Sequence, residues 1–180
     1  MNYENLKKMK KERLQKILEL HKKWLNGDYD GKQANLKNVD LRDTDLKNIN
    51  LSKSILYRVN LEWSNLEGAN LSEAKISLSN LSYCNLKNVN LTNANLHICD
   101  LEKVNLSYAN LNHINLNSIN LYASNLKGVN LENSNLTAVD LMYANLKDTN
   151  LKDTNLKYVN LYKNNLKNLK FMSKKYLHLI

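Results

Sequence analysis

Leucine recurs at every fifth position of the chain from Leu36 to Leu166, without an insertion or a deletion, and Ile76 is its one replacement. A spacing of five matches neither the three- or four-residue spacing of an amphipathic helix nor the alternation of a β-strand. The pattern therefore predicts a supersecondary repeat, with 27 units of five residues in a chain of 180 residues. Phe171 adds a degenerate further unit.

The other positions of the unit also follow a rule. The residue two before the leucine is small or β-branched (the small position), and the residue directly before it is asparagine or aspartate (the amide position). Ile55 and Lys75 are exceptions at the amide position, and Asn164 is the exception at the small position. The two residues after the leucine, the first and second outer positions, are mostly polar and vary freely. This combination predicts a packed interior, a solvated exterior, and asparagines that hydrogen-bond to nearby backbone at the corners.

These repeats resemble the pentapeptide-repeat family, whose units read roughly Ala-(Asp/Asn)-Leu-x-x, and the resemblance covers residues 34–168. It implies an all-β fold, a right-handed quadrilateral parallel β-helix in which four units form one coil and the leucines and small positions face inward. About seven coils are then expected, stacked at the inter-strand spacing of roughly 4.8 Å into a rod on the order of 30 Å long. Leucines stacked in this way would fill the interior, as in other solenoids.

Residues 1–33 are predicted to be an N-terminal amphipathic capping helix and a linker. The helix is expected over residues 4–25 and to stop at Asn26-Gly27, with Gly31 in the linker. The alternative is a helix that binds a partner or a membrane surface, because its outer face is rich in lysine, although three glutamates dilute this charge. The apolar residues at near-helical spacing are Leu6, Met9, Leu14, Ile17, Leu18, Trp24 and Leu25.

Residues 169–180 are predicted to be an apolar C-terminal cap or dimerisation tail. The open end of a solenoid invites edge-to-edge association, and a tail here would either close that end or join two molecules. Members of the family often dimerise through this end, so the resemblance favours a homodimer. The residues expected to form the dimer contact or the end cap are Phe171, Met172, Tyr176 and Leu177.

The formal net charge of +9 is concentrated at the two ends of the chain. Residues 34–168 contain 14 basic and 12 acidic residues, whereas residues 169–180 contain three basic residues and no acidic one. The best-known members of the family act on DNA gyrase by imitating duplex DNA, and this imitation requires a strongly negative surface. The nearly neutral barrel and basic ends therefore disfavour a topoisomerase-directed function, which stays the alternative.

One column of first outer positions is basic, but its charge is sparse. Glu67 interrupts it, and phosphate binding requires positive charge dense enough to displace counterions. We therefore expect a solvated face and no nucleic-acid partner. The basic residues of this column are Lys47, Lys87, Lys127, Lys147 and Lys167.

Apolar residues are distributed less evenly than charges. When the units are sorted by four, aromatic and aliphatic residues gather at the outer positions of two neighbouring faces. Contiguous exposed apolar groups usually mark a contact surface, and tryptophan and tyrosine are favoured anchors. A structural ladder of stacked side chains and a contact with the N-terminal helix are the two alternatives. The candidate partner-binding residues are Tyr57, Trp63, Leu78, Tyr83, Ile98, Tyr122, Tyr143 and Tyr162.

On a third face, the second outer position is mostly occupied by residues that tolerate positive φ. This face is predicted to turn through a tight corner, and it is not expected to bind phosphate. The residues concerned are Asn48, Gly68, Asn88, Gly128 and Asp148.

The chain has no arrangement of residues that predicts catalysis. Its four histidines do not stack, Cys84 and Cys99 are expected as small interior residues on different faces, and no glycine-rich phosphate motif occurs. We therefore predict no catalytic, cofactor-binding or metal site and no enzyme activity. No segment has the apolar run of a signal peptide or a membrane span, so a cytoplasmic protein is expected. The predicted function is a rigid, non-catalytic scaffold or protein-interaction module with an unknown protein partner.

Overall fold

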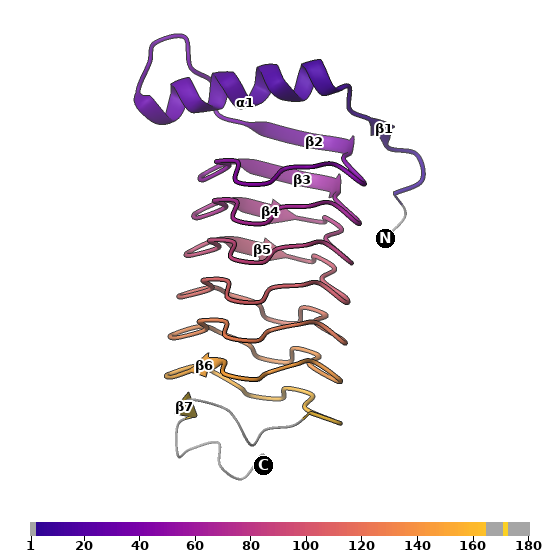
Figure 1. The fold of residues 1–180 in the computed structure, drawn as a ribbon, viewed down its shortest axis with the longest axis vertical. Helices are drawn as coiled ribbons and strands as arrows, with labels where there is room; N and C mark the ends of the chain where they lie inside the picture. Colours follow the sequence, from indigo (N-terminus) through magenta and orange to yellow (C-terminus); the bar gives the residue numbers. More distant parts are fainter. Residues whose placement is uncertain (1–2, 165–170, 173–180) are drawn as a thin grey trace.

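The computed structural model describes residues 3–164 and 171–172 and is a parallel β-solenoid with one helix, as the resemblance implies. Figure 1 shows the coils stacked in sequence order, with the helix lying across one end. The elements in chain order are β1 (Lys7–Lys8), α1 (Lys11–Asn26), β2 (Asn35–Asp40), β3 (Ile55–Asn60), β4 (Lys75–Ser77), β5 (Asn95–His97), β6 (Asn150–Leu151) and β7 (Phe171–Met172).

Residues twenty positions apart lie side by side in neighbouring coils. β2, β3, β4 and β5 pair in parallel in this order, so that Leu36 aligns with Leu56 and Leu56 with Ile76. These regular strands span about three turns, fewer than the expected count of about seven coils, and isolated bridges continue the register as far as Asp140 and Asn160. Each column of side chains along the solenoid therefore consists of every twentieth residue.

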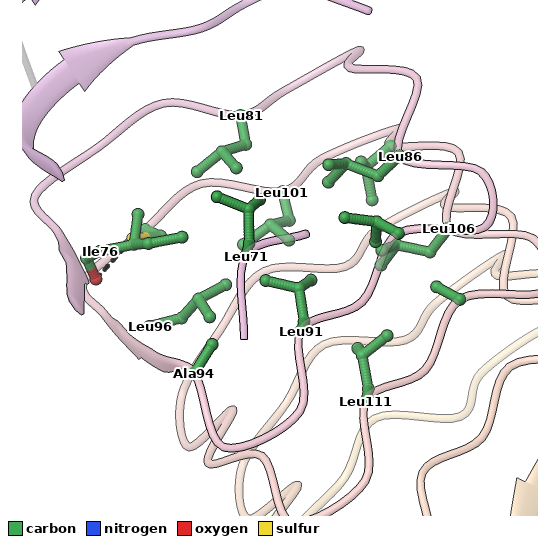
Figure 2. Packing of buried hydrophobic residues seen from close by; sticks show 14 of the residues in the cluster. Leu71, Ile76, Leu81, Leu86, Leu91, Ala94, Leu96, Leu101, Leu106 and Leu111 are labelled. Carbon is green, nitrogen blue, oxygen red and sulfur yellow. Dashed lines mark hydrogen bonds between the residues drawn. The ribbon is translucent and has the colours of Figure 1, made fainter. Parts of the chain in front are cut away.

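The interior is filled by the leucines and the small positions. The central residues from Leu36 to Leu156 are all buried, and Figure 2 shows those of successive coils packed side by side inside the solenoid. Several polar residues at the small position hydrogen-bond to the preceding coil. The hydroxyl of Ser64, for example, donates to the carbonyl of Leu41 at 2.7 Å. Because burial of a leucine contributes about 1.5–3 kcal/mol, this column is the main source of stability.

The amide position holds the corners, as expected from the sequence. The Oδ1 atom of Asn65 accepts the backbone N–H of Glu67 at 3.1 Å, which fixes the local turn. The same Oδ1 atom accepts the side-chain N–H of Asn85 from the next coil at 3.1 Å. Repetition of this pair of bonds links the coils through their side chains as well as through their backbone.

All corners turn through the left-handed region, and not only the corners of one face. Every second outer position from residue 38 to residue 163 has a positive φ, between 52° and 68°. At Gly68 the backbone also forms a closed turn, because the N–H of Ala69 donates to the carbonyl of Leu66 at 3.0 Å. Positive φ at the third residue is typical of a type II turn. The tight corner predicted for one face is therefore confirmed, and the same conformation recurs on the other faces.

The N-terminal segment departs from its predicted form. The helix α1 begins at Lys11, later than the expected residue 4, because the residues before it form β1 and pair with β2. Its C-terminal stop is at Gly27, which has a φ of 84° and donates to the carbonyls of the last turn. Leu14 of α1 is buried, and Met9 and Ile17 pack against the core. The segment from β1 through α1 covers part of the end of the solenoid.

The C-terminal strand β7 is out of register with the repeats. Phe171 aligns with Asn150, and Met172 aligns with Leu151, so the spacing is one residue longer than in the coils before it. The prediction that Phe171 is the centre of a further unit was therefore wrong. Tyr176 and Leu177, and the side chains of Phe171 and Met172, lie outside the described residues.

Candidate partner-binding face

Trp63 and Tyr83 form a stacked aromatic pair on the outside of the solenoid. They occupy second outer positions of consecutive coils, so the register places one ring over the other, with centroids 4.2 Å apart and planes inclined by 18°. Lys103 occupies the next place in the column and donates to the Tyr83 hydroxyl at 2.9 Å. This hydrogen bond, together with that to Glu102, raises the pKa of the Lys103 ammonium above its usual range. Trp63 is nevertheless 58% exposed.

Tyr122, Tyr143 and Tyr162 form a second group farther along the same face. The rings of Tyr122 and Tyr143 meet edge to face, with centroids 5.6 Å apart. Tyr162 is exposed, and the ammonium of Lys163 lies 5.2 Å from the centre of its ring. Lys103 occupies the column between these tyrosines and the stacked pair, so the predicted residues form two aromatic groups on this face.

Tyr57, Leu78 and Ile98 lie at the neighbouring corner. Tyr57 and Ile98 are exposed, whereas Leu78 is half-buried. The hydroxyl of Tyr3 donates to the carbonyl of Leu78 at 3.1 Å, so the N-terminal segment crosses the corner at this point. Burial there raises the pKa of Tyr3 to about 12. The contact at Leu78 is therefore made by the segment that precedes the helix, and not by the helix itself, which was the alternative.

Bulky residues of this surface occupy strained backbone positions. Trp63, Leu78 and Ile98 have φ values of 62°, 52° and 52°. Left-handed backbone is costly for L-residues other than glycine and asparagine, and it is a true outlier for a β-branched residue such as isoleucine. Sequence reasoning missed this strain because glycine marks the corner on one face only. The unbroken period of five was the signal that all faces share one corner conformation.

Sequence reasoning also gave too little weight to three exposed tyrosines. Tyr29, Tyr108 and Tyr158 are all exposed. The ring of Tyr108 lies against Gly128, where an added Cβ would be 2.6 Å from the ring, and the ammonium of Lys127 is 5.6 Å from the ring centre. The glycine therefore provides the space that this tyrosine needs.

Both cysteines are interior residues, as expected. Cys84 and Cys99 are buried and free, and the Cys84 thiol donates to the carbonyl of Leu61 at 2.9 Å. Burial raises the pKa of the Cys84 thiol to about 12 and that of Cys99 to about 11, so neither is a reactive thiolate.

Two further findings apply to the described residues. Residues 3–164 and 171–172 hold no group of three or more histidine, cysteine, aspartate or glutamate side chains suited to a metal ion. Within this part of the chain, no helix is long and apolar enough to cross a membrane.

Family models match most of the solenoid. One described as "Pentapeptide repeats", with 8 copies, matches residues 34–72 and 140–172. A second, described as "Pentapeptide repeat region", matches residues 54–131. The chain belongs to the pentapeptide-repeat family. The family expected from the repeat unit is thereby confirmed.

Solved structures of other pentapeptide-repeat proteins are similar to this one. HetL of the cyanobacterium Nostoc sp. strain PCC 7120, which is involved in heterocyst differentiation regulation, is 28% identical, with a TM-score of 0.40 over 74% of this chain and 66% of HetL. This pentapeptide-repeat protein thus spans just under two thirds of the HetL chain. Rfr23 of the cyanobacterium Cyanothece 51142 is 26% identical, with a TM-score of 0.34 over 76% of this chain and 87% of Rfr23. Full-length QnrB1, a plasmid-mediated fluoroquinolone resistance protein, is 12% identical, with a TM-score of 0.47 over 81% of this chain and 87% of QnrB1. No curated protein matches the chain.

Proposed function

We propose that this pentapeptide-repeat protein is a rigid, non-catalytic scaffold that binds a protein partner through its aromatic face. The observation that carries the proposal is the exposure of bulky apolar side chains at strained corners. We define the aromatic face by the exposed or half-buried residues Tyr57, Trp63, Tyr83, Ile98, Tyr122, Tyr143 and Tyr162.

The strain at these corners opposes stability. A left-handed conformation costs an L-residue about 1–2 kcal/mol, and asparagine or glycine would relieve most of this cost. Ile98 is 53% exposed, so burial offsets only part of its strain. The stacking of Trp63 on Tyr83 contributes about 0.5–1.5 kcal/mol. Side chains that the backbone disfavours and the core does not need are best explained by a contact outside the molecule.

The solenoid also suits a binding role mechanically. Backbone hydrogen bonds link each coil to its neighbours, as between Leu86 and Asn105 at 2.7 Å, so the aromatic face is held in one arrangement. A surface that is ordered before binding loses little conformational entropy on association. Tryptophan and tyrosine are the residues most often found at the energetic centre of interfaces. A cytoplasmic partner is expected, in line with the predicted location.

Electrostatics oppose imitation of DNA. Lys47 and Lys87 both pair with Glu67, at 3.2 and 3.9 Å, so the first part of this column mixes positive and negative charge. Imitation of a nucleic acid requires a continuous field of one sign. A topoisomerase therefore remains the alternative partner and is one outcome of the test.

The test is affinity capture from lysate of the native host, with and without nuclease. The wild type is compared with the double variant Trp63→Ser, Tyr83→Ser. A matched control, His113→Ser with Asn133→Ser, changes second outer positions of two consecutive coils on another face.

A protein retained by the wild type and the control, lost from the double variant and insensitive to nuclease would support the proposal. Circular dichroism must show that the double variant is folded, since its unfolding would assign the aromatic pair a structural role. Capture of topoisomerase subunits would replace the proposal with the alternative. Recovery of the bait alone would contradict a separate partner and indicate self-association.

A further inference from the structure

The first coil has no preceding coil, so its outward backbone groups need other partners. At one side β1 supplies them. The N–H of Met9 donates to the carbonyl of Asp40 at 3.0 Å, and the ammonium of Lys8 donates to the carbonyl of Arg42. The segment before α1 thus takes the place of a missing strand on this side of the coil.

Another side is closed by His21 of the helix. The backbone N–H of Ala34 donates to Nδ1 of His21 at 3.1 Å. Because Nδ1 accepts, the ring proton is on Nε2, which donates to the carbonyl of Ser52 at 3.0 Å. One buried imidazole therefore satisfies two backbone groups at this end of the solenoid.

Between these two capped regions the edge of the first coil is open over residues 45–50. The backbone N–H and C=O of Asp45, the C=O of Lys47, and the N–H and C=O of Asn50 have no hydrogen-bond partner among residues 3–164 and 171–172. Unpaired groups at a sheet edge are a template for another strand. We call residues 45–50 the open edge.

The ladder one coil below shows which bonds an added strand would make. The N–H groups of Leu46 and Asn48 donate to the carbonyls of Asn65 and Glu67, at 2.7 and 2.9 Å, and the N–H of Asn65 donates to the carbonyl of Thr44 at 3.0 Å. A strand added above the first coil would repeat this pattern. Its N–H groups would donate to the carbonyls of Asp45 and Lys47, and one of its carbonyls would accept the N–H of Asp45. An extended peptide thus has a defined direction and register at the open edge.

A groove between α1 and the open edge provides room for side chains. It consists of two cavities of about 430 and 510 Å³, which share Leu18 of the helix and Ile49 of the coil as lining residues. Leu14 and Leu46 also line the second cavity. These volumes are in the range of sites that bury several apolar groups.

Charge at the open edge selects among extended peptides. The carboxylate of Asp45 is the first member of its side-chain ladder, and its Oδ1 atom already accepts the side-chain N–H of Asn65 at 3.2 Å. A carboxylate has no hydrogen to donate, so a strand above it must provide the donor. Asp43, also exposed, lines the same groove on the side of Asp45, whereas Lys8 and Lys11 line it on the side of the N-terminal segment. A lysine or arginine at the amide position of the added strand therefore fits, and an aspartate does not.

We propose that the open edge binds an extended peptide segment of a partner protein by parallel strand addition. The peptide carries a basic residue above Asp45 and an apolar residue that enters the groove beside Leu18 and Ile49. Strand addition of this kind derives affinity from main-chain hydrogen bonds and selectivity from alternate side-chain pockets. This inference is independent of the aromatic face.

The probe is a fluorescent heptapeptide that copies residues 64–70, with lysine in the place of Asn65, and a second peptide has aspartate there. Binding is measured by anisotropy. We expect saturable binding, about five-fold tighter for the lysine peptide, which is the upper range for an exposed charge pair. The variant Asp45→Asn should abolish this difference, because the charge is removed while the turn-forming oxygen is kept.

Two exposed positions of α1 provide the matched steric test. Gln15 lines the groove and Lys16 does not, so Gln15→Trp should weaken both peptides on the order of ten-fold while Lys16→Trp has no effect. Helix content by circular dichroism and slower hydrogen exchange of the Asp45 and Asn50 amides on peptide addition check the fold and the site. Absence of saturable binding, or equal effects of the two tryptophans, would overturn the proposal. So would a dimer that Gln15→Trp dissociates, since the occupant would then be a second copy.

Discussion

Two faces of the solenoid have the same leucine core and different backbones. In the ladder face, which contains Leu66 and Leu86, the side chains of Asn65, Asn85, Asn105, Asn125 and Asn145 are joined in one chain of hydrogen bonds, each at 3.1 or 3.2 Å. In the strand face, which contains β2 to β5, Ile55 and Lys75 interrupt the corresponding row of asparagines. The comparison separates what the leucine determines from what the asparagine determines.

The hydrogen bonding of the corner turn also differs, and it changes together with the residue at the amide position. In the strand face, the N–H of Val59 donates to the hydroxyl of Ser79 at 3.0 Å, and the turn of its own coil stays open. Farther along the same face, the N–H of Ile119 donates to the carbonyl of Leu116 at 3.0 Å, and the turn is closed. Asparagine side chains also begin to link the coils there, with Asn135 donating to Asn115 at 3.0 Å. Burial of the leucines fixes the coil, and consecutive asparagines accompany its closed turns.

The largest effect is expected in the core, and it should be the same on both faces. Leu86 and Ile76 are fully buried, in the ladder face and the strand face respectively. Leu86→Ala and Ile76→Ala should each lower the free energy of unfolding by about 2–5 kcal/mol, measured by denaturant titration. Ile76→Leu, the control, should cost less than about 1.5 kcal/mol. A loss on one face alone would show that the two faces do not share one core.

Removal of an amide should have a smaller effect, which differs between Asn105 of the ladder face and Asn95 of the strand face. The Asn105 side chain makes three hydrogen bonds, to Ser107, Asn85 and Asn125, so Asn105→Ala should cost about 1–3 kcal/mol. Asn95 of the strand face makes no side-chain hydrogen bond to the described residues, and Asn95→Ala should stay within about 0.5 kcal/mol. Equal losses in urea titrations would remove the distinction between the faces.

A third change should stabilise the protein. Ile98 of the strand face has a φ of 52°, and asparagine tolerates this conformation better than isoleucine. Ile98→Asn should raise the free energy of unfolding by about 1 kcal/mol, and the reciprocal change Asn93→Ile, at a φ of 56°, should lower it by a similar amount. Thermal unfolding measures both. An unstable Ile98→Asn variant would mean that Ile98 contributes to the fold, which would weaken its assignment to a partner.

The sequence predicts the features that each unit repeats and not those that depend on contacts between distant segments. The buried leucines and the corner-holding asparagines follow from one unit alone. The start of α1 does not, because Leu6 and Met9 have helical spacing whereas Lys7 and Lys8 pair with β2. The aromatic columns follow from the register. The position of Lys103 between the two aromatic groups follows from the register too. The crossing of Tyr3 over Leu78 and the open edge do not, because they depend on how the N-terminal segment docks.

The smallest effect is expected at the cap, where acidification should loosen the helix from the strand face. Burial of His21 disfavours the charged imidazolium and lowers its pKa below the ordinary value, although the hydrogen bond to the carbonyl of Ser52 acts in the opposite direction. The docked helix is therefore most stable above about pH 6.5, the pKa in an unfolded chain, and loses stability as the pH falls from there towards the lowered pKa.

Trp24 stacks on His21, with ring centroids 5.6 Å apart, and so reports on this contact. In a Trp63→Phe background, the fluorescence of Trp24 and the hydrogen exchange of the α1 amides should change between about pH 7.5 and pH 5. The same measurements on His21→Gln should show a flatter pH dependence. A docked helix that is indifferent to pH in this range would mean that the imidazole does not hold the cap. If the change occurs, protonation of His21 removes the acceptor of the Ala34 N–H. The backbone of the first coil would then have an unpaired group there, as it has at the open edge.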